Sequence, residues 1–155
     1  DSILVTGELG GSILGHHMTF SPRIHEASRI SQDWVIHAAT DISDGLLRDL
    51  DHIAEASGLA AHVDLEAIPL SPGAVELARE SGSSPIQHAL TDGEDFELLL
   101  AVPGDHAGRL LSSQPLECPL TCIGTFHAGQ GVHTVNEEGT LLEVEPAGYQ
   151  HGNPG

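Results

Sequence analysis

The sequence predicts an α+β fold in which helices pack on a mixed β-sheet. The chain has 155 residues, enough for one hydrophobic core, and 39% of them are hydrophobic, as is typical of a globular protein. Segments with strand periodicity and segments with helix periodicity follow one another, joined by connections of unequal length. We therefore expect a single domain over residues 1–155, with an irregular tail over residues 146–155.

The first part of the chain predicts two strands separated by a glycine-rich turn and a short helix. The first apolar run ends in Thr6-Gly7, and three more glycines follow before residue 16. No Gly-Lys-Ser/Thr follows them, so this is not a nucleotide-binding P-loop. The expected elements are a strand over 2–6, a helix beginning near Ser12, a helix over 23–30 and a buried strand over 34–39.

A helix over 44–57 is the most strongly patterned element, because Leu46, Leu47, Leu50 and Ile53 recur at helical spacing. Ser43 or Asp41 can cap its start, and Gly58 can end it. The remaining expected elements are strands over 61–65, 94–102, 120–126, 132–136 and 140–145, and helices over 73–80, 84–91 and 105–113.

The charge balance excludes several classes of partner. There are 23 acidic residues against 5 basic ones, all of them arginine, and the formal net charge is −18. Such a surface repels nucleic acid and anionic membranes. An anionic nucleotide therefore needs metal ions, backbone amides or another part of the protein. No apolar run has the length of a membrane helix, and no signal peptide is visible, so we expect a cytoplasmic protein.

Two cysteines, Cys118 and Cys122, lie four positions apart in an extended segment. An extended chain of that length spans roughly 13 Å, which is too far for a disulfide. We expect both to be reduced and partly buried, which fits the cytosol.

The run Asp41-Ile42-Ser43-Asp44-Gly45 stands where a strand pattern stops and a helix pattern starts. Carboxylates are hard oxygen ligands that suit Mg²⁺. The amides and the positive dipole end at a helix start suit phosphate. Asp41, Ser43 and Asp44 together suggest a site for magnesium and phosphate, and helix capping by these side chains is the alternative that the spacing leaves open.

A second acidic segment, Glu94-Asp95-Phe96-Glu97, leads into an apolar run. In an extended segment Glu94 and Phe96 face one way and Asp95 and Glu97 the other. A solvated strand entrance is one interpretation; the other is that Glu94, which follows a glycine turn, points into a cleft. The eleven histidines offer no zinc-protease spacing, and no catalytic triad stands out.

Four motifs together resemble the C-terminal domain of thiamine-monophosphate kinases, in the aminoimidazole ribonucleotide synthase superfamily. Their order and spacing match that family over nearly the whole chain. They are residues 1–10 (DSILVTGELG), residues 41–46 (DISDGL), residues 93–98 (GEDFEL) and Gly148-Tyr149.

The resemblance implies an enzyme that uses ATP to phosphorylate thiamine monophosphate, giving thiamine diphosphate. It implies that Asp41 and Asp44 bind Mg²⁺, that Ser43 contacts the nucleotide, and that Glu94 and Tyr149 contact the substrate. Phosphoryl transfer mainly needs alignment and charge neutralisation, so no covalent nucleophile is expected.

The chain departs from the family pattern in several places. An N-terminal domain with most magnesium ligands and the dimer interface would precede Asp1, as would an arginine that contacts ATP. We therefore expect the full-length protein to be a homodimer and this chain alone to be inactive. Gly11 and Gln150 stand where the family usually has aspartate. Two rival functions remain: another ATP-using synthase of the superfamily, or a non-catalytic acidic domain that binds divalent metal ions.

Overall fold

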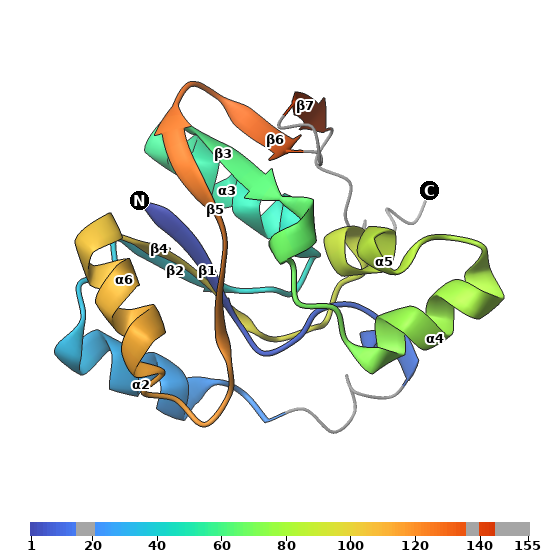
Figure 1. The fold of residues 1–155 in the computed structure, drawn as a ribbon, viewed down its shortest axis with the longest axis horizontal. Coiled ribbons are helices and arrows are strands. Elements are labelled where there is room, and N and C mark those ends of the chain that lie inside the picture. Colours follow the sequence, from blue (N-terminus) through green and yellow to red (C-terminus); the bar gives the residue numbers. More distant parts are fainter. Residues whose placement is uncertain (15–20, 136–139, 145–155) are drawn as a thin grey trace, which may run out of the picture.

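The computed structural model describes residues 1–14, 21–135 and 140–144, and its centre is a seven-stranded sheet (Figure 1). The strand order is β2-β4-β1-β5-β3-β6-β7. Neighbouring strands run antiparallel except β3 and β6, which are parallel, so the predicted mixed sheet is confirmed. The strands are β1 (Ser2–Thr6), β2 (Ala38–Asp41), β3 (Leu59–Asp64), β4 (Leu98–Val102), β5 (Leu120–Ala128), β6 (Gly131–Val135) and β7 (Leu141–Val144).

Helices cover both faces of the sheet. On one face α3 packs on β2, β3 and β6 and also meets α5; on the other, α6 packs on β1 and β5 with α2 beside it (Figure 1). The helices are α2 (Ile24–Asp33), α3 (Leu46–Ser57), α4 (Pro72–Ser81), α5 (Pro85–Thr91) and α6 (Gly104–Ser113), with 3₁₀ turns η1 (Ser12–Leu14) and η2 (Leu65–Ala67).

The core has two parts because the central strands are buried on both sides. In β1, Ile3 and Val5 join the cluster under α3, whereas Leu4 joins the cluster under α2 and α6. In β4, Leu99 joins the cluster under α3 and Leu100 joins the cluster under α2 and α6. Side chains alternate between the faces of a strand, so a continuous apolar run predicts a strand covered on both sides.

Two predicted strands are shorter than the sequence suggests. The strand expected over 34–39 begins only at Ala38, because Trp34 and Ile36 pack against the cluster under α2 and α6. It is also half-exposed, since β2 lies at the edge of the sheet. The strand expected over 94–102 begins only at Leu98, because Glu94 and Phe96 have φ of 66° and 52°, which no strand allows.

The other helices and strands on described residues lie close to their predicted positions. Cys118 and Cys122 are free thiols, the first buried and the second half-buried, as predicted. Among the described residues no helix is long and apolar enough to cross a membrane. The predicted tail, with Tyr149 and Gln150, lies outside the described residues.

One end of the sheet gathers three loops that are distant in sequence. Strands β1 and β2 both run antiparallel to β4, so the ends of β1 and β2 lie beside the start of β4. Residues 7–11, 42–45 and 93–97 therefore meet at this end. It carries most of the predicted site residues.

Candidate active site

The strand-to-helix corner over residues 41–45 presents carboxylates to solvent. Asp41 is exposed at the end of β2 and pairs with Leu98 in the ladder. Ile42 is fully buried and fixes the corner to the core, while Ser43 and Asp44 are half-buried. Asp44 lies 4.0 Å from the Arg48 guanidinium, at the limit of an ion pair between two partly exposed side chains. The corner thus has a rigid backbone and carboxylates that a ligand can reach.

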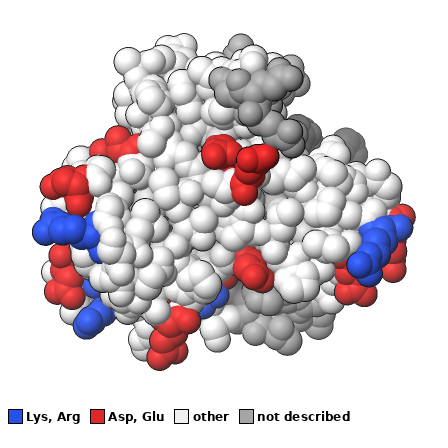
Figure 2. Space-filling model, viewed as in Figure 1, with Lys and Arg blue, Asp and Glu red and all other residues white. Residues whose placement is uncertain are grey.

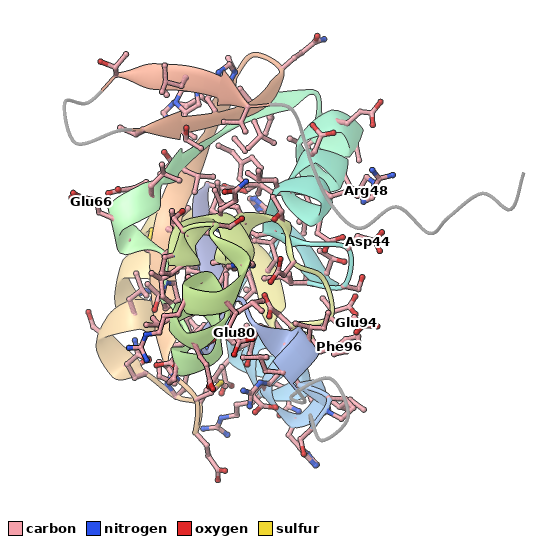
Figure 3. All side chains as sticks on the ribbon, turned by 90° about the vertical axis from the view of Figure 1, so that its right-hand side faces the viewer. Asp44, Arg48, Glu66, Glu80, Glu94 and Phe96 are labelled. Carbon is pink, nitrogen blue, oxygen red and sulfur yellow. The ribbon has the colours of Figure 1, made fainter. Side chains whose placement is uncertain are left out.

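Loop 93–97 is fastened to this corner by backbone hydrogen bonds. The Ile42 amide donates to the Glu97 carbonyl at 2.8 Å, and the Phe96 amide donates to the Ile42 carbonyl at 2.8 Å. The Glu94 amide donates to the Ser43 carbonyl at 2.9 Å. Glu94 is exposed, and Figure 3 shows it on the same side of the molecule as Asp44. The structure therefore brings Asp41, Ser43, Asp44 and Glu94 to one edge.

Gly93 allows the loop to approach the corner this closely. A Cβ at Gly93 would lie 2.5 Å from the Ser43 carbonyl oxygen, closer than real Cβ contacts occur. On the other side of the loop, a Cβ at Gly45 would lie 2.9 Å from the Thr91 carbonyl oxygen. The two glycines let the two backbones touch directly, so the spacing between Glu94 and the corner is set by main chain.

The prediction that Ser43 or Asp41 caps the helix is wrong. The residue at the cap is Gly45, and α3 begins at Leu46. Instead, the buried carboxylate of Asp49 in the first turn accepts hydrogen bonds from the Ser43 and Asp44 amides, at 2.9 and 3.0 Å. Burial raises the pKa of Asp49, and the two amides oppose that rise. The chain's own carboxylate therefore occupies these two amides, which precede the helix.

Asp41 and Asp44 fit a magnesium site as part of its ligand set. Among the described residues no group of three or more His, Cys, Asp or Glu side chains is arranged to hold a metal ion. Magnesium, however, is commonly bound through one or two carboxylates together with water and substrate phosphates. The two aspartates are hard oxygen donors with solvent access, so they suit that role. Figure 2 shows another face of the molecule than the one that carries Asp44 and Glu94 in Figure 3, and its few basic side chains lie toward the margins of that face.

The opposite side of loop 93–97 carries acids that the sequence analysis left undecided. Asp95 and Glu97 are each only 3% exposed, so the solvated-entrance interpretation is wrong for them. Asp95 accepts hydrogen bonds from the Gly10 amide at 3.0 Å and from the Ser12 hydroxyl. Burial raises the pKa of Asp95 to about 6, although the bonds from Ser12 and Gly10 act in the other direction.

Glu97 forms a bidentate ion pair with Arg23. The guanidinium Nε and Nη2 lie 2.8 and 2.7 Å from the Glu97 carboxylate oxygens, and the Thr6 hydroxyl donates to the same carboxylate at 2.5 Å. The hydrogen bond from Arg23 to Glu97 raises the pKa of Arg23 above its ordinary value. These contacts tie the loop to β1 and to the start of α2. These contacts join residues far apart in the sequence, so no local pattern predicts them. The position of Glu97 directly before a fully apolar strand is nevertheless a signal that it is buried.

A pocket of about 440 Å³ opens beside this buried network. Its walls include the glycine turn after β1, the carboxylates of Asp95 and Glu97, and the thiol of Cys118. A Cβ at Gly11 would lie 2.2 Å from the Gly73 carbonyl carbon, so this backbone has no room for the aspartate expected there. Among the polar side chains that line the pocket, Ser12 bonds to Asp95 and Arg23 bonds to Glu97, so these groups belong to the scaffold behind the corner.

The fold and site define a class of protein, and comparison with known families identifies it. The chain belongs to the family described as AIR synthase related protein, C-terminal domain, whose model matches residues 1–136. The structure of Escherichia coli HypE, a hydrogenase maturation protein, matches with a TM-score of 0.74 at 21% identity, over 99% of this chain and 50% of that chain. That likeness concerns the fold alone.

The more similar relatives within this class are thiamine-monophosphate kinases. The Rhodopirellula baltica enzyme is 38% identical over 152 residues, covering 98% of this chain and 48% of the relative. The Salmonella typhimurium enzyme is 34% identical, covering 90% of this chain and 42% of the relative. A structure of AaThiL complexed with AMPPCP and TMP has a TM-score of 0.74 and 30% identity, over 97% of this chain and 51% of that chain. The chain thus spans about half the length of these relatives.

Proposed function

We propose that this chain is the C-terminal domain of a thiamine-monophosphate kinase, which transfers the γ-phosphoryl group of ATP to thiamine monophosphate and gives ADP and thiamine diphosphate. The observation that carries the proposal is the accessible edge of Asp41, Ser43, Asp44 and Glu94, in a chain 38% identical to such a kinase over 98% of its length. The TMP and AMPPCP bound by the neighbouring AaThiL structure support the same pair of substrates.

Each residue of this edge has a proposed role. Asp41 and Asp44 hold Mg²⁺, which neutralises phosphate charge when it is bound. The amide and carbonyl of Ser43 are both engaged within the chain, so its hydroxyl is the group that it offers to the nucleotide. Glu94 contacts thiamine monophosphate from loop 93–97. Tyr149 completes the substrate contacts in the proposal, although it lies outside the described residues.

The rest of the enzyme is proposed to come from an N-terminal domain that this chain does not include. The family resemblance implies that most of the magnesium ligands lie on that domain, and the described residues of this chain add no group of three or more metal-ligating side chains. We therefore propose that the full-length protein is a cytoplasmic homodimer whose N-terminal domain supplies the missing ligands. The 155-residue chain alone is then inactive.

A test compares the full-length protein with this chain under identical conditions. With ATP and Mg²⁺, the full-length protein should convert thiamine monophosphate to thiamine diphosphate, and the isolated chain should not. Substrates of the other ATP-using synthases of the superfamily serve as the second arm. Turnover of one of those substrates, without thiamine diphosphate formation, would replace the proposed function with that rival.

A non-catalytic metal-binding domain is the less favoured alternative. Such a domain needs a ligand set of its own, and the described residues contain no such group of three or more. The structure favours a shared site, in which nucleotide phosphates complete the coordination. Tight Mg²⁺ binding by the isolated chain without ATP would support the alternative.

A further inference from the structure

A buried histidine, His88, connects two helices and the loop that carries Glu94. His88 lies on α5 and is 9% exposed. Its Nδ1 lies 2.9 Å from the Asp92 carboxylate, and its Nε2 lies 2.7 Å from the hydroxyl oxygen of Ser81, the last residue of α4. One imidazole therefore joins the end of α4 to the residue that follows α5.

The chemistry of the Asp92 carboxylate fixes the direction of one of the two hydrogen bonds. An ionised carboxylate only accepts, so Nδ1 carries the proton that is given to Asp92. At Nε2 the protonation of the ring decides: without a proton the nitrogen accepts from the Ser81 hydroxyl, and with one it donates to the hydroxyl oxygen. The Ser83 amide donates to the Ser81 oxygen at 3.1 Å. Hydrolase triads have the same order of groups, but here the nearby amide points at the serine oxygen itself, so the arrangement suits a structural link.

Asp92 transmits the position of His88 to the candidate active site. Its amide donates to the His88 carbonyl at 2.9 Å, and its side chain returns to the same residue. A Cβ on Gly45 would lie 3.3 Å from the Asp92 carbonyl oxygen, so Asp92 packs directly against the corner. The next two residues are Gly93, which touches Ser43, and Glu94, whose amide donates to Ser43.

We propose that His88 is a positioning residue for substrate binding: through Asp92 it fixes loop 93–97 and so sets Glu94 relative to Asp41 and Asp44. Its role in substrate binding rests on the proposed kinase function; its role in holding the loop does not. Side chains that bind substrate need supporting contacts of this kind, because a displacement of about 1 Å can cost on the order of a hundredfold in rate.

Two substitutions of His88 separate the two halves of the link. In His88→Asn the side-chain nitrogen takes the place of Nδ1 and can still reach Asp92. In His88→Gln the side-chain amide takes the place of Nε2, which keeps the reach to Ser81 and gives up Asp92. Asp92→Ala removes the same bond without altering the buried imidazole, and His25→Asn, on the exposed face of α2, is the matched control.

Amide hydrogen exchange of the full-length protein measures directly how firmly loop 93–97 is held. In His88→Gln and Asp92→Ala, the amides of Glu94 and Phe96 should exchange roughly tenfold faster. In His88→Asn and His25→Asn they should exchange as in the unmodified protein. Equal protection in all four variants would overturn the proposal, as would equal loss in both His88 variants, because a merely structural role does not distinguish them.

Steady-state kinetics of the same variants measures the effect on substrate binding. His88→Gln and Asp92→Ala should raise the KM for thiamine monophosphate roughly tenfold, with the KM for ATP unchanged. An unchanged KM for thiamine monophosphate in both variants would contradict the positioning role. The unmodified full-length protein could lack kinase activity while the His88→Gln and Asp92→Ala variants still show faster amide exchange in the loop. In that case the proposed function fails, and the role of His88 in fixing the loop stands.

Discussion

Two sets of acids meet at the same end of the sheet and differ in almost every physical property. The outer acids reach solvent and are Asp41, Asp44 and Glu94. The inner acids are at most 4% exposed and are Asp49, Asp95 and Glu97. Each inner acid accepts two or more hydrogen bonds from main chain or side chains far along the sequence or at a helix start. The inner acids build the scaffold, and we propose that the outer acids serve a ligand.

Loop 93–97 carries both sets within four residues. Glu94 and Phe96 have positive φ, a conformation that costs of order 1 kcal/mol or more for each residue. The contacts of Asp95 with the glycine turn and of Glu97 with Arg23 hold the loop in that conformation. Burying two acids is therefore the means by which the loop keeps Glu94 beside the corner.

The largest expected effect on stability comes from removing an inner acid. Glu97→Ala should lower the free energy of unfolding by about 4 kcal/mol, because it leaves Arg23 and Thr6 without their buried partner. Glu94→Ala, three positions earlier on the outer side, should change it by less than about 0.5 kcal/mol. Urea denaturation of the chain measures both. A similar loss of unfolding free energy in the two variants would contradict the distinction between inner and outer acids.

The inner acid Asp95 should give stability a specific dependence on pH. Its folded-state pKa, about 6, lies above its ordinary value of 3.8, so the folded chain binds the proton more tightly than the unfolded chain. Its stabilising effect is complete at pH below 3.8 and is lost as pH rises through about 6. Relative to Asp95→Asn, the unmodified chain should lose up to about 3 kcal/mol across that interval. Parallel pH profiles for the two proteins would contradict this pKa.

The contact between the two loops should be sensitive to one methyl group. Gly93→Ala places a Cβ against the Ser43 carbonyl and should lower the free energy of unfolding by about 2 kcal/mol. Gly108→Ala is the matched control, because it lies within α6 with open space around it. The control should be stabilising by roughly 0.5 kcal/mol. Thermal unfolding of both variants gives the comparison, and a neutral Gly93→Ala would mean that the loops are not in contact.

The smallest expected effect on stability comes from an outer acid. Asp41→Asn should change the free energy of unfolding by less than about 0.5 kcal/mol, because the side chain is exposed. Chemical denaturation at neutral pH measures it. A loss above about 1 kcal/mol would place Asp41 among the scaffold residues.

Periodicity predicted most of the fold, because apolar spacing along one element is local information. The continuous apolar run of β4 and the helical spacing of Leu46, Leu47 and Leu50 both identified their elements correctly. The shortened ends of β2 and β4 escaped prediction because side-chain packing and positive φ override a strand-like pattern there.

The outer acids could be singled out from sequence, and their inner counterparts could not. The turn chemistry of residues 41–46 and the family resemblance both pointed to Asp41 and Asp44. Asp95 and Glu97 depend on partners 74 to 91 positions away, and no local pattern reveals such contacts. His88 and Asp92 lie four positions apart in the sequence, but the burial that gives this spacing its meaning depends on tertiary packing.

The central claim, that outer acids serve the ligand and inner acids serve the fold, is tested most directly by magnesium titration of the full-length enzyme. Asp41→Asn and Asp44→Asn should lower turnover by on the order of a hundredfold and shift the magnesium requirement upward, while the proteins stay folded. Asp95→Asn, measured alongside, should keep the magnesium dependence of the unmodified enzyme. Unchanged titration curves for Asp41→Asn and Asp44→Asn would contradict the account.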